Sequence, residues 1–208
     1  MKYKYIIWDW NGTLLNDVGA ALDSVNDMLK ARNMPPMDIV RYKEIIGVPI
    51  RKFYEKCFDL EKEDYNEILK QWNKGYLRHL PEHNLTEGVT EMLEYFKKEG
   101  CTQLIVSSSN KEQLIANVSK YNIADYFDAI LGADGYLAES KVQQAINYLQ
   151  SKEKGNALVI GDLEHDAQMA EEIGADCILL STGHEKLERL KNSGYPVIDK
   201  ITEIKNYI

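Results

Sequence analysis

Short apolar runs alternate with amphipathic segments along most of the chain. Runs of Ile, Val, Leu and aromatic residues that end in turn signals predict buried strands. They cover residues 5–8, 104–106, 129–131, 157–160, 177–180 and 197–198. Apolar residues at helical spacing predict helices over residues 89–96, 111–121, 142–149 and 165–173, with a short one after residue 198. Because strands that alternate with helices favour right-handed crossovers, we predict an α/β fold with a Rossmann-like parallel sheet.

The stretch after the first predicted strand has a different pattern. Apolar residues recur there at helical spacing without a convincing strand, over residues 18–29, 38–46, 51–59 and 63–79. Asp17 stands where an N-cap would stand before the first of these helices. We therefore predict a helical domain over residues 16–86, inserted into an α/β core domain made of residues 1–15 and 87–208.

Composition and charge limit the partners of the protein. Its 208 residues carry a formal net charge of -8. A nucleic acid or an anionic membrane surface would usually require a basic face, so we expect neither as a partner, whereas an acidic site suits metal cations. No window approaches the ~20 apolar residues of a membrane span. Three scattered cysteines predict reduced thiols in a cytoplasmic protein.

Polar residues cluster where four predicted strands end or where the next helices begin. Asp9 follows the first strand, Ser107 the second, and Asp162 the fourth, while Lys141 opens a helix after the third. The carboxyl ends of parallel strands lie on one edge of a sheet, so these side chains can converge.

The converging residues suit phosphoryl transfer. Asp9 can act as a carboxylate nucleophile that forms an aspartyl-phosphate, which water later cleaves. Mg²⁺ prefers oxygen ligands, and Asp9, Asp162 and the backbone carbonyl of Asn11 can supply them. Ser107 and the amides that follow it can hold phosphate oxygens at a helix N-terminus, and Lys141 can neutralise charge on the nucleophile and the phosphoryl group.

The ordered set resembles the haloacid dehalogenase-like hydrolase superfamily. That family's motifs run Asp-x-Asp-Gly-Thr, Ser or Thr, Lys, and Gly-Asp-x-x-x-Asp. Here they read Asp9 to Thr13, Ser107, Lys141, and Gly161-Asp162 to Asp166. A helical cap inserted directly after the first motif is similar to the phosphoglycolate phosphatase and β-phosphoglucomutase-like branch.

The resemblance implies a Mg²⁺-dependent phosphatase acting on a small phosphorylated metabolite. It implies that Asp9 is both nucleophile and metal ligand, that Asp162 is the second metal ligand, and that Asp166 supports the metal or its waters. The implied phosphate-binding set is Gly12, Thr13, Ser107, Ser108 and Lys141.

One residue departs from the family pattern. Asn11 stands where the family's second acid protonates the leaving oxygen and then activates water, and an amide has no titratable proton to give. General acid–base catalysis is worth about 10²–10⁴ in rate. Either the substrate has a good leaving group, or another residue acts, with His165 and side chains of the helical cap as candidates, or Asn11, which precedes Gly12, deamidates and becomes an acid. The alternative hypothesis is a phosphate-ligand binding protein that has lost turnover.

The predicted helical domain holds the candidates for substrate specificity. Residues 46–52 resemble the family's specificity loop, and Arg51 or Lys52 could reach an anionic group on the substrate or could be ordinary solvated charges. A minor alternative is an enzyme like phosphonoacetaldehyde hydrolase, which uses a cap lysine as a Schiff base and also lacks the second acid. That lysine comes closer to the glycine of the loop than Lys52 does to Gly47.

Other residues near the motifs are expected to have structural roles. Trp8 and Trp10 alternate onto the same face and should pack against neighbouring helices. His165 could move protons near neutral pH or be a partly exposed surface residue. We expect His79, His83 and His184 on the surface, because their spacing does not suggest a metal site.

Overall fold

A single parallel sheet forms the centre of the molecule. The computed structural model describes residues 2–133 and 140–208. The strand order is β3-β2-β1-β4-β5-β6, with every pairing parallel. The strands are β1 (Tyr5–Trp8), β2 (Thr102–Asn110), β3 (Ala129–Ala133), β4 (Ala157–Gly161), β5 (Asp176–Leu180) and β6 (Val197–Ile198). This confirms the predicted Rossmann-like α/β fold.

Helices cover both faces of the sheet, so β1 and β4 are buried along their whole length. On one face, Ile6 and Trp8 pack in a cluster with α5 (Val89–Lys98), α6 (Lys111–Lys120) and the 3-10 helix η3 (Ile201–Asn206). On the other face, Tyr5 and Ile7 pack in a cluster with α7 (Lys141–Gln150), α8 (Glu164–Ile173) and α9 (Leu187–Asn192). Two further 3-10 turns are η1 (Leu80–Glu82) and η2 (Ala124–Tyr126).

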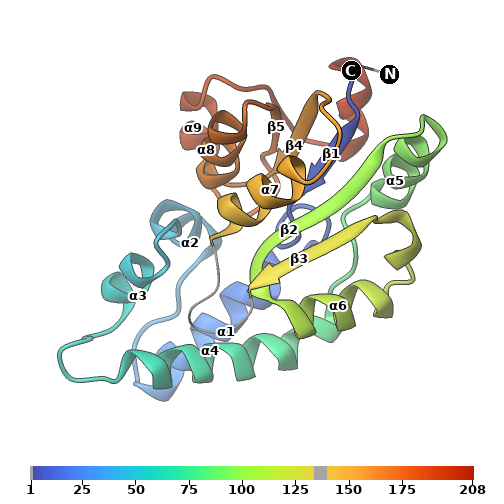
Figure 1. Ribbon diagram of the computed structural model, residues 1–208. Coiled ribbons are helices and arrows are strands. Elements are labelled where there is room, and N and C mark those ends of the chain that lie inside the picture. The colour runs from blue at the N-terminus through green and yellow to red at the C-terminus, as the bar shows by residue number, and fades with distance from the viewer. Residues whose placement is uncertain (1, 134–139) are drawn as a thin grey trace.

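Of the five α-helices that lie between β1 and β2 in the described chain, the first four belong to the stretch in which no strand was predicted. They are α1 (Val18–Ala31), α2 (Ile39–Ile45), α3 (Arg51–Cys57) and α4 (Tyr65–His79), and we call them the inserted helices. Helices α1 and α4 pack against each other, and the arrows of β1 and β3 point toward the inserted helices (Figure 1). The hydrophobic cluster on the Trp8 face of the sheet continues into these helices through residues such as Val25 and Phe53. The carboxyl edge of the sheet is therefore the part of the core that faces them.

Most predicted elements are present, with shifted ends. The strand predicted over residues 104–106 is longer, because β2 includes the serines that follow it. The helix α9 was not predicted, since its six residues contain too few apolar positions to show a period. Trp8 and Trp10 share one cluster and contact Phe96 and Tyr121, as expected. Among the described residues, none of the helices combines the length and the apolar character needed to cross a bilayer.

Candidate active site

Asp9 and Asp162 meet where the strand order reverses. The chain builds β2 and β3 on one side of β1 and then crosses to place β4 on the other side. Trp8 is in register with Ile160, and the backbone N–H of Asp9 donates to the carbonyl of Ile160 at 2.9 Å. Ligands of open α/β sheets bind at such a switch point, outside the carboxyl ends of the strands. The structure therefore brings the first and fourth predicted motifs together there.

Lys141 joins the third motif to this pair. It is the first residue of α7, and the Ser140 side chain caps that helix by accepting from the N–H of Gln143 at 3.1 Å. The buried Nζ donates to Oδ1 of Asp9 and, at 2.6 Å, to Oδ1 of Asp166. Burial opposes the charged form of Lys141, but the charges of Asp166 and Asp9 outweigh it and hold its pKa above the usual value.

Asp166 fixes the loop that carries Asp162. Its Oδ2 accepts from the backbone N–H groups of Asp162 and Leu163, both at 3.0 Å, while its Oδ1 accepts from Lys141. The preceding Gly161 is needed for this approach, because a Cβ there would lie 2.2 Å from the Asp166 carboxyl. Asp166 therefore orients both the loop that carries Asp162 and the side chain of Lys141.

Three buried carboxylates can share a cation. Oxygen atoms of Asp9, Asp162 and Asp166 lie within 4.8 Å of one another, and within the described part of the chain no other group of acids, histidines or cysteines does so. Burial raises the pKa of Asp9 to about 6, although Lys141 opposes it, and raises the pKa of Asp162 well above its usual value. Three acids with one lysine leave excess negative charge in a desolvated space, and a divalent cation with a preference for oxygen would neutralise it.

The serines after the apolar part of β2 border the same site. Ser107 is buried, and its Oγ accepts from the N–H of Ser109 at 3.1 Å. Ser109 in turn donates to Oδ1 of Asn11 at 2.7 Å, while Ser108 is exposed. On the other side, Thr13 is buried and donates to Oδ1 of Asp162 at 3.1 Å. These contacts bring the second predicted motif into contact with the first, and the first into contact with the fourth.

The amide side chain of Asn11 is hydrogen-bonded through both its nitrogen and its oxygen. Its Nδ2 donates to Oδ2 of Asp17 at 2.7 Å and to the hydroxyl of Tyr76 at 2.9 Å, and its Oδ1 accepts from Ser109. The amide orientation follows from the carboxylate of Asp17, which can only accept. Gly12, whose φ is +76°, donates its N–H to Oδ1 of Asp17 at 2.8 Å. Asn11 is therefore a structural member of the loop of residues 9–15, which we call the nucleophile loop because the sequence predicts Asp9 as the nucleophile.

Comparison with known proteins identifies the family of the chain. The family model described as haloacid dehalogenase-like hydrolase matches residues 6–180. The chain belongs to the haloacid dehalogenase-like hydrolase family. A phosphoglycolate phosphatase of Rhodobacter capsulatus is 24% identical over 87% of this chain and 85% of its own length. A 5'-nucleotidase of Pseudomonas aeruginosa is 24% identical over 92% of this chain and 88% of its own length.

The fold is also found among solved structures of the family. A haloacid dehalogenase-like hydrolase from Streptococcus pneumoniae superposes with a TM-score of 0.82 at 20% identity, covering 99% of this chain and 98% of its own. Family membership makes the protein a haloacid dehalogenase-like hydrolase. Its four motifs lie at the carboxyl edge of the sheet, where the parallel strand order predicts that they meet.

The prediction for His184 is wrong. Its ring is buried, and its backbone N–H donates to Oδ2 of Asp162 at 2.6 Å. Ring nitrogen Nε2 lies 3.3 Å from Oδ1 of Asp17, and Nδ1 lies 2.9 Å from the hydroxyl of Tyr42. The feature of the sequence that could have placed His184 at the site is its position after β5, because Gly183-His184 follows that strand on the same edge of the sheet as the other motifs. Its spacing from the other histidines carried no information.

Asp17 was also assigned too simply. It does stand at the N-cap position of α1, but its side chain makes no capping hydrogen bond. Instead the carboxylate accepts from Gly12, Asn11 and Tyr76 and pairs with His184. Burial alone would raise the pKa of Asp17, but His184 and these hydrogen bonds outweigh burial and lower that pKa. Burial alone would lower the pKa of His184, but Asp17 outweighs burial and raises that pKa to about 9.

The candidate specificity residues lie on α3. Arg51 and Lys52 are both exposed, and Arg51 donates to Glu55 at 3.1 Å and stacks its guanidinium over the ring of Tyr65 at 4.9 Å. None of the contacts found in the described chain joins Arg51 or Lys52 to the carboxylate cluster. His165 is half-buried at the start of α8, and burial together with Lys141 lowers its pKa.

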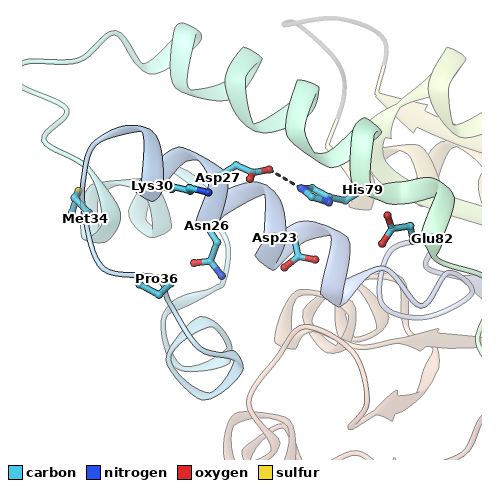
Figure 2. A pocket seen from close by; sticks show the side chains of 8 residues that line it. All are labelled: Asp23, Asn26, Asp27, Lys30, Met34, Pro36, His79 and Glu82. Atoms are coloured by element: carbon cyan, nitrogen blue, oxygen red, sulfur yellow. Dashed lines mark hydrogen bonds and ion pairs between the residues drawn. The ribbon is translucent and has the colours of Figure 1, made fainter.

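A separate hollow lies on the inserted helices. It has a volume of about 510 Å³ and is lined by α1, the loop after it and α4 (Figure 2). Asp27 in this hollow is bound to His79 at 2.6 Å, so the expected surface histidine has a specific partner. Asp23 and Glu82 do not converge with that pair into a possible metal site. Among the described residues, the hollow therefore lacks a cluster of converging acidic side chains like the one at the carboxyl edge of the sheet.

Proposed function

We propose that this protein is a Mg²⁺-dependent phosphatase that hydrolyses a small phosphorylated metabolite through an aspartyl-phosphate on Asp9. The observation that carries the proposal is the buried Lys141, whose ammonium group joins Asp9 to Asp166 beside Asp162. A nucleophilic carboxylate, a fixed cation and a further acid at a switch point are the parts that phosphoryl transfer requires. The names of the phosphatase relatives support the same reaction class.

The reaction has two displacement steps. A carboxylate oxygen of Asp9 attacks phosphorus, and the bond from phosphorus to the leaving oxygen breaks. Water then attacks phosphorus, the bond to Asp9 breaks, and inorganic phosphate leaves with the carboxylate restored. Lys141 neutralises charge on Asp9 and on the phosphoryl group during both steps.

The cation site and the phosphate site share this edge of the sheet. Asp9, Asp162 and the carbonyl of Asn11 would hold Mg²⁺, with Asp166 supporting them, and the bound ion supplies positive charge to the phosphoryl oxygens. Phosphate oxygens would be bound by Gly12, Thr13, Ser107, Ser108 and Lys141.

The leaving group is expected to be a good one. The Asn11 amide has no titratable proton, and its Nδ2 and Oδ1 are already hydrogen-bonded to protein groups, so it does not serve as a general acid. Acyl and aryl phosphates need little protonation as they leave, whereas alkyl esters need a general acid. We therefore propose that the protein hydrolyses acyl and aryl phosphates faster than alkyl esters, with phosphoglycolate as the reference alkyl ester.

A substrate panel tests the proposal. Acetyl phosphate, p-nitrophenyl phosphate, phosphoglycolate and a nucleoside 5'-monophosphate are incubated with Mg²⁺, with EDTA, and with the Asp9→Asn variant. We expect Mg²⁺-dependent phosphate release that Asp9→Asn abolishes, and a Mg²⁺-dependent beryllofluoride adduct at Asp9. Silence on the whole panel, together with tight binding of a phosphate ester, would favour the alternative of a binding protein.

A further inference from the structure

A buried chain of hydrogen bonds connects the inserted helices to the nucleophile loop, and His184 is its central residue. The His184 ring lies directly against the loop backbone, since a Cβ on Gly12 would be 2.6 Å from its Cδ2 and 2.2 Å from an oxygen of Asp162. Its backbone N–H holds Asp162 at 2.6 Å. His184 thus contacts both the nucleophile loop and Asp162.

The two ring nitrogens point to different parts of the molecule. Nε2 faces Asp17, the carboxylate that binds the N–H of Gly12 and the amide of Asn11. Nδ1 shares a hydrogen bond with the hydroxyl of Tyr42, which belongs to α2. Tyr42 is itself buried, with its ring edge-on to Phe53 at 5.7 Å. The chain therefore runs from α2 through His184 and Asp17 to the loop.

A second contact from the core fixes the end of α2. Arg189 on α9 donates to the carbonyls of Ile46 and Glu44 at 2.9 and 2.7 Å, and it pairs with Glu185 at 2.6 Å. Glu185 directly follows His184, so the segment that carries the imidazole also holds the end of the helix that carries Tyr42. The distance from Tyr42 to His184 is thus set by two connections between the same elements.

We propose that His184 is a positioning residue for the hydrolysis, and that the Tyr42 hydroxyl fixes its ring so that the backbone of Gly12 keeps the nucleophile loop in its reactive arrangement. The inference rests on the proposed phosphatase function for its kinetic readout. Docking of α2 on the core then completes the arrangement of the loop.

The test begins with Tyr42→Phe, which removes one hydroxyl and keeps the packed ring. The matched control is Tyr54→Phe, which removes a hydroxyl from a neighbouring buried tyrosine of α3. With p-nitrophenyl phosphate and Mg²⁺, we expect Tyr42→Phe to lower kcat roughly 2- to 10-fold, the range for one lost hydrogen bond, with little change in KM. Tyr54→Phe should match wild type.

A double-mutant cycle separates positioning from general damage. In the His184→Gln background, where the backbone N–H to Asp162 remains, Tyr42→Phe should have no further effect on kcat. Full additivity of the two kcat losses, or a wild-type kcat for Tyr42→Phe, would overturn the inference.

An NMR measurement keeps the inference independent of turnover. The amide resonance of Gly12 should shift in Tyr42→Phe and not in Tyr54→Phe. If wild type hydrolyses nothing on the panel, the proposed function fails, but a shifted Gly12 resonance still supports the chain of contacts. An unshifted resonance refutes that chain even in an active enzyme.

Discussion

Replacing Asn11 by Asp tests why this site differs from its family. Nδ2 of Asn11 lies 2.7 Å from Oδ2 of Asp17, so the variant places an oxygen where a donor stood. Two carboxylate charges centred about 4 Å apart at an effective dielectric constant near 20 would repel by about 4 kcal/mol. The pair therefore retains one proton near neutral pH, because the two acids cannot both ionise. The variant should possess the general acid that wild type lacks.

The assay compares two leaving groups. We expect Asn11→Asp to raise kcat for phosphoglycolate, or for whichever alkyl ester is hydrolysed, by at least about tenfold, out of the 10²–10⁴ that general acid catalysis can give. Hydrolysis of p-nitrophenyl phosphate should change far less, since its leaving group needs little protonation. Asn66→Asp, which makes the same substitution on the exposed surface of α4, should leave both rates unchanged.

Stability gives an independent check on the shared proton. A carboxyl whose pKa is raised by folding stabilises the fold fully below its unfolded pKa and loses that contribution as pH rises through the folded value. Urea unfolding of Asn11→Asp should therefore show a deficit against wild type that grows from pH 4 to pH 8. An unchanged alkyl-ester rate with a pH-independent deficit would refute the reasoning and show that another residue already protonates the leaving group.

Three further predictions concern the buried charges and the Asn11 amide. Lys141→Met should abolish turnover and lower the free energy of unfolding by about 3–5 kcal/mol in urea, since it leaves buried carboxylates without their cation, whereas Lys98→Met at an exposed pair should do neither. Mg²⁺ at about 100 times its Kd should stabilise wild type by about 2.7 kcal/mol in thermal unfolding. That stabilisation should weaken below about pH 6, where Asp9 takes up a proton, and disappear in Asp162→Asn. Peptide mass spectrometry should find Asn11 as the intact amide, because the Gly12 N–H that would attack it is bound to Asp17; an Asp at position 11 would support deamidation instead.

The motif residues were predictable because local sequence places them. An apolar run fixes a strand, a turn ends it, and parallel pairing then brings the strand ends to one edge. Asp9 and Asp162 needed only those steps, and they meet across β1 and β4. The prediction for Lys141 needed one further step, which was to recognise the start of a helix after the third strand.

The residues that surround the motifs were not predictable in the same way. His184 and Tyr42 lie 142 positions apart in the chain, and their hydrogen bond depends on how α2 docks on the core. No periodicity or spacing encodes that docking. Asp17 illustrates the same limit, because capping is the expected local use of an acid before a helix, and a tertiary arrangement took the carboxylate elsewhere.

This tertiary arrangement also gives a physical reason for an amide, rather than a carboxyl group, at position 11. Asp17 is buried, has a lowered pKa, and accepts hydrogen bonds from several groups while pairing with His184. A neighbour that donates suits such a carboxylate, and the amide of Asn11 donates without adding charge. An aspartate at position 11 would have to share a proton with Asp17, in a site that already buries the carboxyl groups of Asp9, Asp162 and Asp166. Asn11 therefore stabilises the loop that carries Asp9. Under the proposed mechanism the same amide leaves position 11 without a proton donor, so that one side chain sets both the stability of this loop and the range of leaving groups.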